Sequence, residues 1–337
     1  MGTNLKDYIC TIPFTDVNVM ENKSEYVCCK DWMDIDIADK RENGTGWTSQ
    51  IAKDVRNSML DGSFKYCSTS ACPHLSTVTK SNIPVGPIIK KELFDPSMYS
   101  EIGPKNIKFS FDSACNLACP SCRIDFIRNS EFIENRTIRI LDDIKNGYGS
   151  SIETIAMSGY GDPFYSSAFF KFLQEFDETA FPKLNRIHLH TNAILWNKSN
   201  WEKIKNTHRY IKTAEISIDA ATEETYKVVR KGGKWDLLLR NLEFINELKE
   251  LEQITFSFVI QKQNYHEIFD FYKLIKSIVR NKEIYFLYYS IQDWGILTSE
   301  EYQTMKVWDK THPEYGKFIS VVEKLRQVRD NNVSISY

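Results

Sequence analysis

Three cysteines at short spacing are the residues of this chain best suited to chemistry. Three residues separate Cys115 from Cys119, and two separate Cys119 from Cys122. A structural zinc site takes four protein ligands, so these three cysteines alone would leave it incomplete. A four-iron cluster suits them better, because three thiolates can hold three irons and leave the fourth iron open. The alternative is three inert thiols, since free cysteine is a common core residue.

The elements around these cysteines predict how they are positioned. A strand over 107–111 precedes them and a helix over 131–146 follows them, which is how a barrel delivers ligands to its C-terminal rim. The same alternation continues to the end of the chain, which predicts a parallel sheet with right-handed crossovers. The further strands are expected at 152–157, 186–190, 214–218, 254–261, 283–291 and 333–337, and the further helices at 166–176, 200–209, 222–230, 235–249, 265–279 and 314–330.

The cysteine spacing after the first strand resembles the fingerprint of the radical SAM superfamily. The resemblance implies an α/β fold, a partial (βα)6 barrel, with a 4Fe-4S cluster on Cys115, Cys119 and Cys122. It also implies that S-adenosylmethionine binds this cluster and yields a 5′-deoxyadenosyl radical, with electrons from a donor such as flavodoxin or ferredoxin. Ser121 departs from the family, which usually has an aromatic residue there.

Other segments resemble the family's cofactor contacts. The segment after the second strand is similar to the glycine-rich motif for the methionyl amine, with an aspartate in place of the usual glutamate. Segments after the third and fourth strands resemble the ribose and carboxylate contacts, and residues 226–233 resemble the segment whose arginine pairs with the methionyl carboxylate. The residues that this resemblance implies are Gly159, Tyr160, Gly161, Asp162, Asn192, Ser217, Asp219 and Arg230.

Strand alternation predicts a polar interior. Ile187 and Leu189 would pack against helices, so His190 would point inward, and the same argument turns Glu215 and Gln261 inward on the next two strands. Polar groups are costly to bury unless they are paired or wet. We therefore expect a chamber for a polar cofactor and substrate, with these three residues as candidate catalytic groups; they could also simply pair with one another.

Four further cysteines occur in the first part of the chain: Cys10, Cys28, Cys67 and Cys72. With short strands at 9–14, 17–19 and 25–29 and a helix at 49–60, they are similar to twitch or SPASM modules. That resemblance implies an auxiliary 4Fe-4S cluster in a domain over 1–92, placed before a barrel domain over 93–337. A structural zinc site on the same residues is the alternative, and whether the site is fully ligated stays open. Alternation turns Cys29 away from Cys28 and predicts a spare thiol.

Composition narrows the class of protein. All eight cysteines lie in the first 122 of 337 residues, which indicates metal binding or catalysis rather than disulfides in a cytoplasmic chain. The N-terminus lacks the apolar region of a signal peptide, and no apolar run reaches the length of a membrane span. A net charge of -2 with charges of both signs interspersed gives no basic face for nucleic acid. We expect a cytoplasmic protein without membrane or nucleic-acid partners.

The expected function is that of a radical SAM enzyme of the oxidoreductase or maturase type. The expected reaction is an oxidative or epimerising change to a ribosomally made peptide, which would need a separate peptide-recognition protein or a docking edge on this chain. Dehydrogenation or epimerisation of a sugar or cyclitol is the alternative. A non-catalytic zinc or iron-sulfur module is the second alternative. Neither the substrate nor the oligomeric state follows from the sequence.

Overall fold

The computed structural model describes residues 5–33, 46–81, 83–157 and 160–337. The chain forms two compact units. The first unit contains Met1–Asp112, Arg136–Met157 and Asp177–Asn185. The second contains Ser113–Asn135, Ser158–Phe176 and Arg186–Tyr337.

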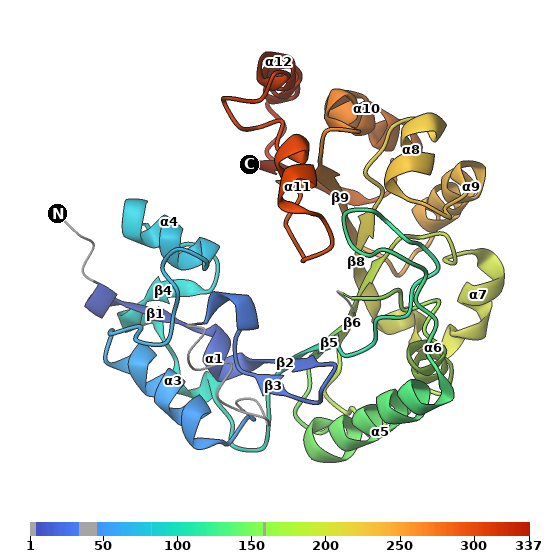
Figure 1. Ribbon diagram of the computed structural model, residues 1–337. Helices are drawn as coiled ribbons and strands as arrows, with labels where there is room; N and C mark the ends of the chain where they lie inside the picture. The colour runs from blue at the N-terminus through green and yellow to red at the C-terminus, as the bar shows by residue number, and fades with distance from the viewer. Residues whose placement is uncertain (1–4, 34–45, 82, 158–159) are drawn as a thin grey trace. The chain divides into compact units, whose positions relative to one another are not determined.

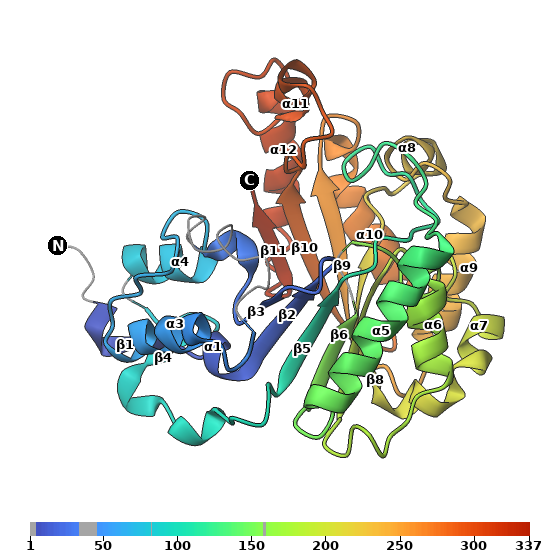
Figure 2. The ribbon, with the colours of Figure 1, turned by 60° about the horizontal axis from the view of Figure 1, so that its bottom comes forward.

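The sheet of the first unit crosses the predicted domain boundary. Strand β2 (Asp16–Met20) pairs in parallel with β5 (Asn106–Ser110), which pairs in parallel with β6 (Thr154–Met157). The short β3 (Glu25–Tyr26) adds to β2 in antiparallel (Figure 2). Residues before and after position 92 therefore share one sheet, and the boundary between 1–92 and 93–337 stays a prediction.

The remainder of the first unit is a small α+β arrangement around a second sheet (Figure 1). Strand β1 (Tyr8–Cys10) pairs with β4 (Ile88–Lys90) in antiparallel, and α3 (Gln50–Leu60) contacts β1. Ser49 caps α3 by accepting a hydrogen bond from the Ala52 N–H, as its position before the helix suggests. The other short elements are η1 (Leu5–Asp7), α1 (Ile12–Thr15), η2 (Lys30–Trp32), α4 (Pro73–Ser81), η3 (Lys91–Leu93) and η4 (Pro96–Met98).

Two predictions for this unit were wrong in detail. The strand expected over 9–14 ends at Cys10, because Pro13 is in the first turn of α1, where proline is well tolerated. The strand expected over 25–29 ends at Tyr26, the last residue of β3. Beyond these predictions, residues 76–104 contain the end of α4 and strand β4. The pairing of β4 with β1 decides its structure, and local sequence carries little signal for such a distant partner.

Five parallel strands form the sheet of the second unit. They lie in the order β7 (Arg186–Thr191), β8 (Ile211–Ser217), β9 (Gln253–Ile260), β10 (Glu283–Ser290) and β11 (Val333–Ser336). The register places Glu215 beside His190 and Ser257 beside Ser217. Neighbouring strands therefore bring the predicted inward-facing groups together.

Helices follow the strands of this unit, as predicted, and Figure 1 shows α8, α9 and α10 outside β8 and β9. Aromatic side chains join helix to sheet: Phe258 contacts Phe271 of α10 and Tyr288 of β10. The capping box of Thr298 and Glu301 starts α11, a helix that was not predicted. The helices are α6 (Ser167–Gln174), α7 (Lys198–Lys203), η5 (Lys205–Tyr210), α8 (Glu223–Val229), α9 (Trp235–Asn246), η6 (Tyr265–Glu267), α10 (Ile268–Ile278), α11 (Ser299–Met305) and α12 (Tyr315–Arg326); α5 (Glu131–Tyr148) has residues in both units.

The predicted fold class is confirmed in its main feature. Strands and helices alternate from β5 onward, and the fold is α/β with a mostly parallel sheet, consistent with a partial barrel. Within the described ranges, no helix combines the length and the hydrophobicity that crossing a membrane requires.

Candidate functional site

The three cysteines lie on one loop of the second unit, residues 113–123, called here the cysteine loop. Cys115 and Cys119 are buried, whereas Cys122 is exposed. The N–H groups of Cys122 and Arg123 both donate to the carbonyl of Cys119, at 2.8 and 2.9 Å, which makes a tight turn between the last two cysteines. The Cys115 N–H donates to the carbonyl of Ile127 and closes the loop on its own C-terminal side.

The cysteine loop contacts the end of α8. The Ala118 N–H donates to the carbonyl of Lys231 at 3.0 Å. The next residue, Gly232, has φ +91°, and a Cβ there would lie 2.5 Å from Cε1 of Phe126. Only glycine suits this position, because a side chain would be strained and would collide with the segment that follows the cysteines.

Each cysteine sulfur also has a side-chain N–H donor. Asn192 Nδ2 lies 3.7 Å from Cys115 Sγ, Arg230 Nη1 lies 3.6 Å from Cys119 Sγ, and Arg123 Nη2 lies 3.3 Å from Cys122 Sγ. Asn192 follows β7, Arg230 follows α8, and Arg123 belongs to the loop itself. Donors that face sulfur stabilise thiolates and cluster sulfurs.

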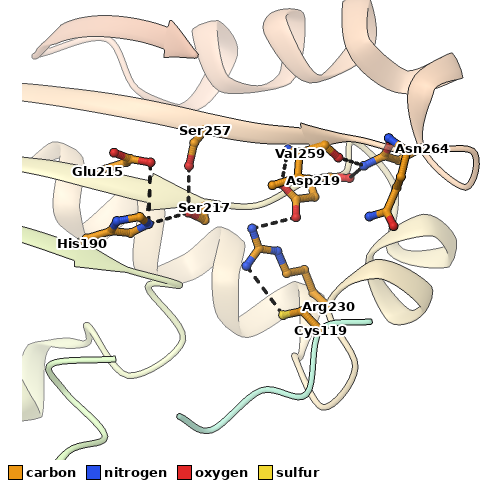
Figure 3. A network of polar contacts seen from close by, with 10 residues as sticks. Cys119, His190, Glu215, Ser217, Asp219, Arg230, Ser257, Val259 and Asn264 are labelled. Carbon is orange, nitrogen blue, oxygen red and sulfur yellow. Dashed lines mark hydrogen bonds and ion pairs between the residues drawn. The ribbon is translucent and has the colours of Figure 1, made fainter. Parts of the chain in front are cut away.

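Arg230 also forms a buried ion pair, as Figure 3 shows. Its Nη2 lies 2.7 Å from Oδ2 of Asp219, whose side chain is fully buried. The Val259 N–H donates to the other carboxylate oxygen at 2.7 Å. Burial raises the pKa of Asp219, whereas Arg230 and this N–H lower it. Arg230 Nε is buried without a hydrogen-bond partner among the described residues, so the guanidinium can still take a further acceptor.

Asp162 has a full set of partners of its own. One carboxylate oxygen accepts from the Thr191 hydroxyl at 2.7 Å and from the Asn192 N–H at 2.9 Å, and the other accepts from the Phe164 N–H at 3.0 Å. Burial raises the pKa of this carboxyl. Asp162 thus holds the turn that presents Asn192 to the cysteine loop, and its predicted place beside the methionyl amine stays a prediction. Gly159 lies outside the described residues, and Tyr160 is 44% exposed.

The predicted catalytic residues divide into two places. His190 Nε2 lies 3.6 Å from Glu215 Oε1 and 3.0 Å from the Ser217 hydroxyl, which lies 2.7 Å from the Ser257 hydroxyl (Figure 3). This polar row (His190, Glu215, Ser217 and Ser257) crosses three neighbouring strands. Gln261 lies at the end of β9 instead, where its backbone N–H donates to Asn264 Oδ1 at 2.9 Å.

One comparison with known proteins identifies the family of the domain that contains the cysteine loop. Residues 110–275 match the model of the Radical SAM superfamily. The chain contains a radical SAM domain. It is an enzyme of that superfamily, for which a 4Fe-4S cluster and S-adenosylmethionine are the family's cofactors. The cysteine loop, the polar row and Arg230 all lie inside the matched range, whereas Cys10, Cys28, Cys67 and Cys72 lie before it.

Solved structures similar to the chain are distant. TYW1 with a lysine-pyruvate adduct bound is 18% identical, covering 63% of this chain and 70% of that one, with a TM-score of 0.37. The anSMEcpe complex with AdoMet and the Cp18Cys peptide is 23% identical, covering 54% and 50%, with a TM-score of 0.38. BtrN in complex with AdoMet and 2-DOIA is 11% identical, covering 69% and 95%, with a TM-score of 0.30. No curated protein matches the chain.

The second unit contains site residues that sequence reasoning missed. Tyr289 hydrogen-bonds Ser257, and burial together with Asp219 and Glu215 raises its pKa above the usual range. Its neighbour Tyr288 is in the core, so strand alternation could have turned Tyr289 to the polar side, but the aromatic run in β10 obscured it. Glu267 is a second omission: it accepts the hydroxyls of Thr222 and Thr225, both at 2.6 Å, at the start of the helix that ends at Arg230.

The four N-terminal cysteines line one cavity in the first unit. Its walls are mainly apolar and aromatic, and Cys29 is not among them. Burial raises the pKa of Cys10 and of Cys67 to about 12, so either thiol would lose its proton only to a bound metal. The lining residues are Cys10, Ile12, Pro13, Cys28, Trp32, Met33, Val55, Met59, Phe64, Tyr66, Cys67, Cys72, His74, Leu75 and Ile88.

The spacing of potential ligands bears on the kind of metal. Among the described residues, no group of three or more His, Cys, Asp or Glu side chains is arranged to hold a metal ion. A single zinc ion would draw all its sulfurs to about 2.3 Å from one point. A cubane attaches each thiolate to a different iron, so its ligands are spread around a larger group.

Proposed function

We propose that this protein is a radical SAM enzyme of the oxidoreductase or maturase type, which takes a hydrogen atom from a polar substrate. The observation that carries the proposal is the cysteine loop, whose three sulfurs each lie beside an N–H donor. Cys115, Cys119 and Cys122 would hold a 4Fe-4S cluster. The cluster and S-adenosylmethionine would supply a 5′-deoxyadenosyl radical.

Residues of the second unit suit a zwitterionic cofactor next to that cluster. Arg230 has an unpartnered Nε for a carboxylate, and Asn192 lies beside Cys115. Ser217 ends β8 and Asp219 follows it, and residues 160–162 follow β6, so all lie at the carboxyl ends of parallel strands. The carboxyl ends of parallel strands are where α/β folds bind ligands. We therefore keep these residues, with Gly159, as the proposed cofactor contacts.

The direct test uses reconstituted protein, dithionite and S-adenosylmethionine under anaerobic conditions. We expect 5′-deoxyadenosine to form at a rate that depends on the cluster. A spectroscopically intact cluster that forms no 5′-deoxyadenosine would refute catalysis and favour a non-catalytic iron-sulfur module.

For the substrate we propose a ribosomally made peptide, changed by oxidation or epimerisation. Three large apolar side chains next to the cysteine loop support this class: Ile124, Phe126 and Phe132 are 76%, 50% and 70% exposed. Exposed apolar side chains gathered in one segment are typical of surfaces that bind partners. A separate peptide-recognition protein could present such a substrate.

A sugar or cyclitol is the second candidate. The hydroxyl and imidazole groups of the polar row favour it, because they could hydrogen-bond a polyol. Candidate peptides and cyclitols can be compared by how strongly each stimulates 5′-deoxyadenosine formation, and the class that does so identifies the substrate.

Arg230→Lys is expected to weaken cofactor binding. Lysine keeps the charge but loses the planar fork that can hold Asp219 and a carboxylate together. The loss should be about 1–3 kcal/mol, the usual range for a charge-assisted hydrogen bond. Calorimetric titration with S-adenosylmethionine measures it, with Arg240→Lys on the exposed face of α9 as the matched control. Wild-type affinity in Arg230→Lys would remove this residue from the cofactor site.

Alanine at His190 or Glu215 is expected to abolish the stimulation of 5′-deoxyadenosine formation by substrate while basal formation continues. Either group could take the proton when the substrate radical is oxidised further. The same substitution at Gln261 should have a smaller effect, because that residue lies apart from the polar row. Normal substrate turnover in all three variants would show that the polar row has another role.

We also propose that Cys10, Cys28, Cys67 and Cys72 hold an auxiliary 4Fe-4S cluster in a twitch- or SPASM-like module. Their common cavity supports this, with zinc as the alternative metal. Full ligation by four cysteines would leave no iron open, so the cluster would serve electron transfer or structure. Flavodoxin or ferredoxin is the proposed electron donor. The eight free thiols fit a reducing compartment, and we propose the cytoplasm.

A further inference from the structure

The donors at the three cysteine sulfurs differ in charge. Asn192, which faces Cys115, is neutral, whereas Cys119 and Cys122 each face an arginine. Reduction of a cluster adds negative charge, so a nearby cation stabilises the reduced form. Of the three donors, the two arginines are therefore the ones that can change the reduction potential most.

Arg123 keeps its full positive charge beside the cluster site. Its Nη1 donates to the carbonyl of Ser113 at 2.8 Å, and its Nη2 contacts the Tyr160 carbonyl as well as Cys122 Sγ. These partners are neutral backbone oxygens and a ligand sulfur. Among the residues that the structure describes, no carboxylate forms an ion pair with Arg123.

Arg230 is different, because its charge is neutralised. Asp219 lies 2.7 Å from Nη2, on the side of the guanidinium away from Cys119, as Figure 3 shows. The carboxylate is fully buried and is held by the Val259 N–H, so solvent does not screen it. A buried pair of opposite charges has a weak field at the cluster compared with a lone cation.

We propose that Arg123 raises the reduction potential of the cluster on the cysteine loop, and that Asp219 holds the potential down by neutralising Arg230. This inference rests on the proposed function. Both residues act through contacts to ligand cysteines or to their partner, so they are positioning and tuning residues rather than catalytic ones. Arg123 also ties the start of the cysteine loop, at Ser113, to its end.

The test is an EPR-monitored redox titration of reconstituted protein without S-adenosylmethionine. The signal that changes when S-adenosylmethionine is then added identifies the cluster of the cysteine loop. Arg123→Met should shift its midpoint potential to more negative values, and Arg123→Lys should shift it less. Asp219→Asn should shift it to more positive values, because it leaves the charge of Arg230 unopposed. Arg240→Met, on α9, should leave it unchanged.

Arg123→Met and Asp219→Asn are expected to shift the midpoint potential in opposite directions, and the inference depends on both shifts. Wild-type midpoint potentials in both Arg123→Met and Asp219→Asn, or shifts of the same sign, would overturn the inference. If Arg123→Met does not assemble a cluster, Arg123→Lys and Asp219→Asn report the same quantity. Failure of the wild-type protein to form any EPR-active cluster on the cysteine loop would instead refute the proposed function.

Discussion

Cys122→Ala is expected to lose the cluster of the radical SAM domain and to form no more 5′-deoxyadenosine than a reaction without enzyme. A cubane with an open iron has only three protein thiolates, and two do not hold it firmly. Cys115→Ala and Cys119→Ala should have the same result. Iron and sulfide analysis, together with 5′-deoxyadenosine assays after reconstitution, measures both losses.

Cys122 gives the sharpest of these tests, because it is exposed while the other two cysteines are buried. An exposed thiol contributes little to packing, so replacing it by alanine should leave the free energy of unfolding nearly unchanged. Cys29→Ala is the matched control for removing a thiol. Wild-type iron content and 5′-deoxyadenosine formation in Cys122→Ala would mean that the three cysteines are inert.

Cys28→Ala is expected to lose the iron of the auxiliary site, whereas Cys29→Ala retains it. Cys28 lines the cavity of the first unit together with Cys10, Cys67 and Cys72, and Cys29 does not. The two residues are adjacent and chemically identical, so any difference between the two variants comes from the position of the thiol. Iron and zinc counting by mass spectrometry on the reconstituted proteins also separates a cluster from a structural zinc ion.

The radical SAM cluster provides an internal control for that experiment. It should still form in Cys28→Ala, and its EPR signal should still respond to S-adenosylmethionine. Equal loss of iron from Cys28→Ala and Cys29→Ala would contradict the assignment, and so would full iron content in Cys28→Ala.

The local pattern of apolar and polar residues was enough to predict much of the fold. Strand and helix periods reflect which side chains face the core, and this signal lies within a few residues of sequence. The predicted strands from 107 to 291 accordingly agree with β5 to β10 within a few residues at either end. The cysteine spacing likewise lies within eight residues, so it was readable without a structure.

The site depends on contacts between residues that lie far apart in the sequence, which a local sequence pattern does not predict. The prediction that Arg230 meets the cofactor carboxylate stays a prediction. The structure adds two contacts that the sequence did not show, an ion pair with Asp219 and a contact with Cys119, 111 residues away. The place of Asp162 at the cofactor also stays a prediction, and the structure adds that one of its oxygens accepts from the turn at Thr191 and Asn192. Ionic and hydrogen-bond partners are chosen by the geometry of the folded chain, because any carboxylate is chemically able to accept from any donor.

The sequence by itself determined the alternation of strands and helices, the radical SAM cysteine motif and the polar face of the strands that contain His190 and Glu215. Only the tertiary structure decided that four scattered cysteines share one cavity, that β2 pairs with β5 across the expected domain boundary, and that His190 meets Glu215 while Gln261 does not. The physical reason is the distance along the chain over which each kind of interaction acts. Side-chain alternation and backbone propensity act between neighbours in the chain, whereas strand pairing and the closure of a cavity depend on the packing energy of the whole fold.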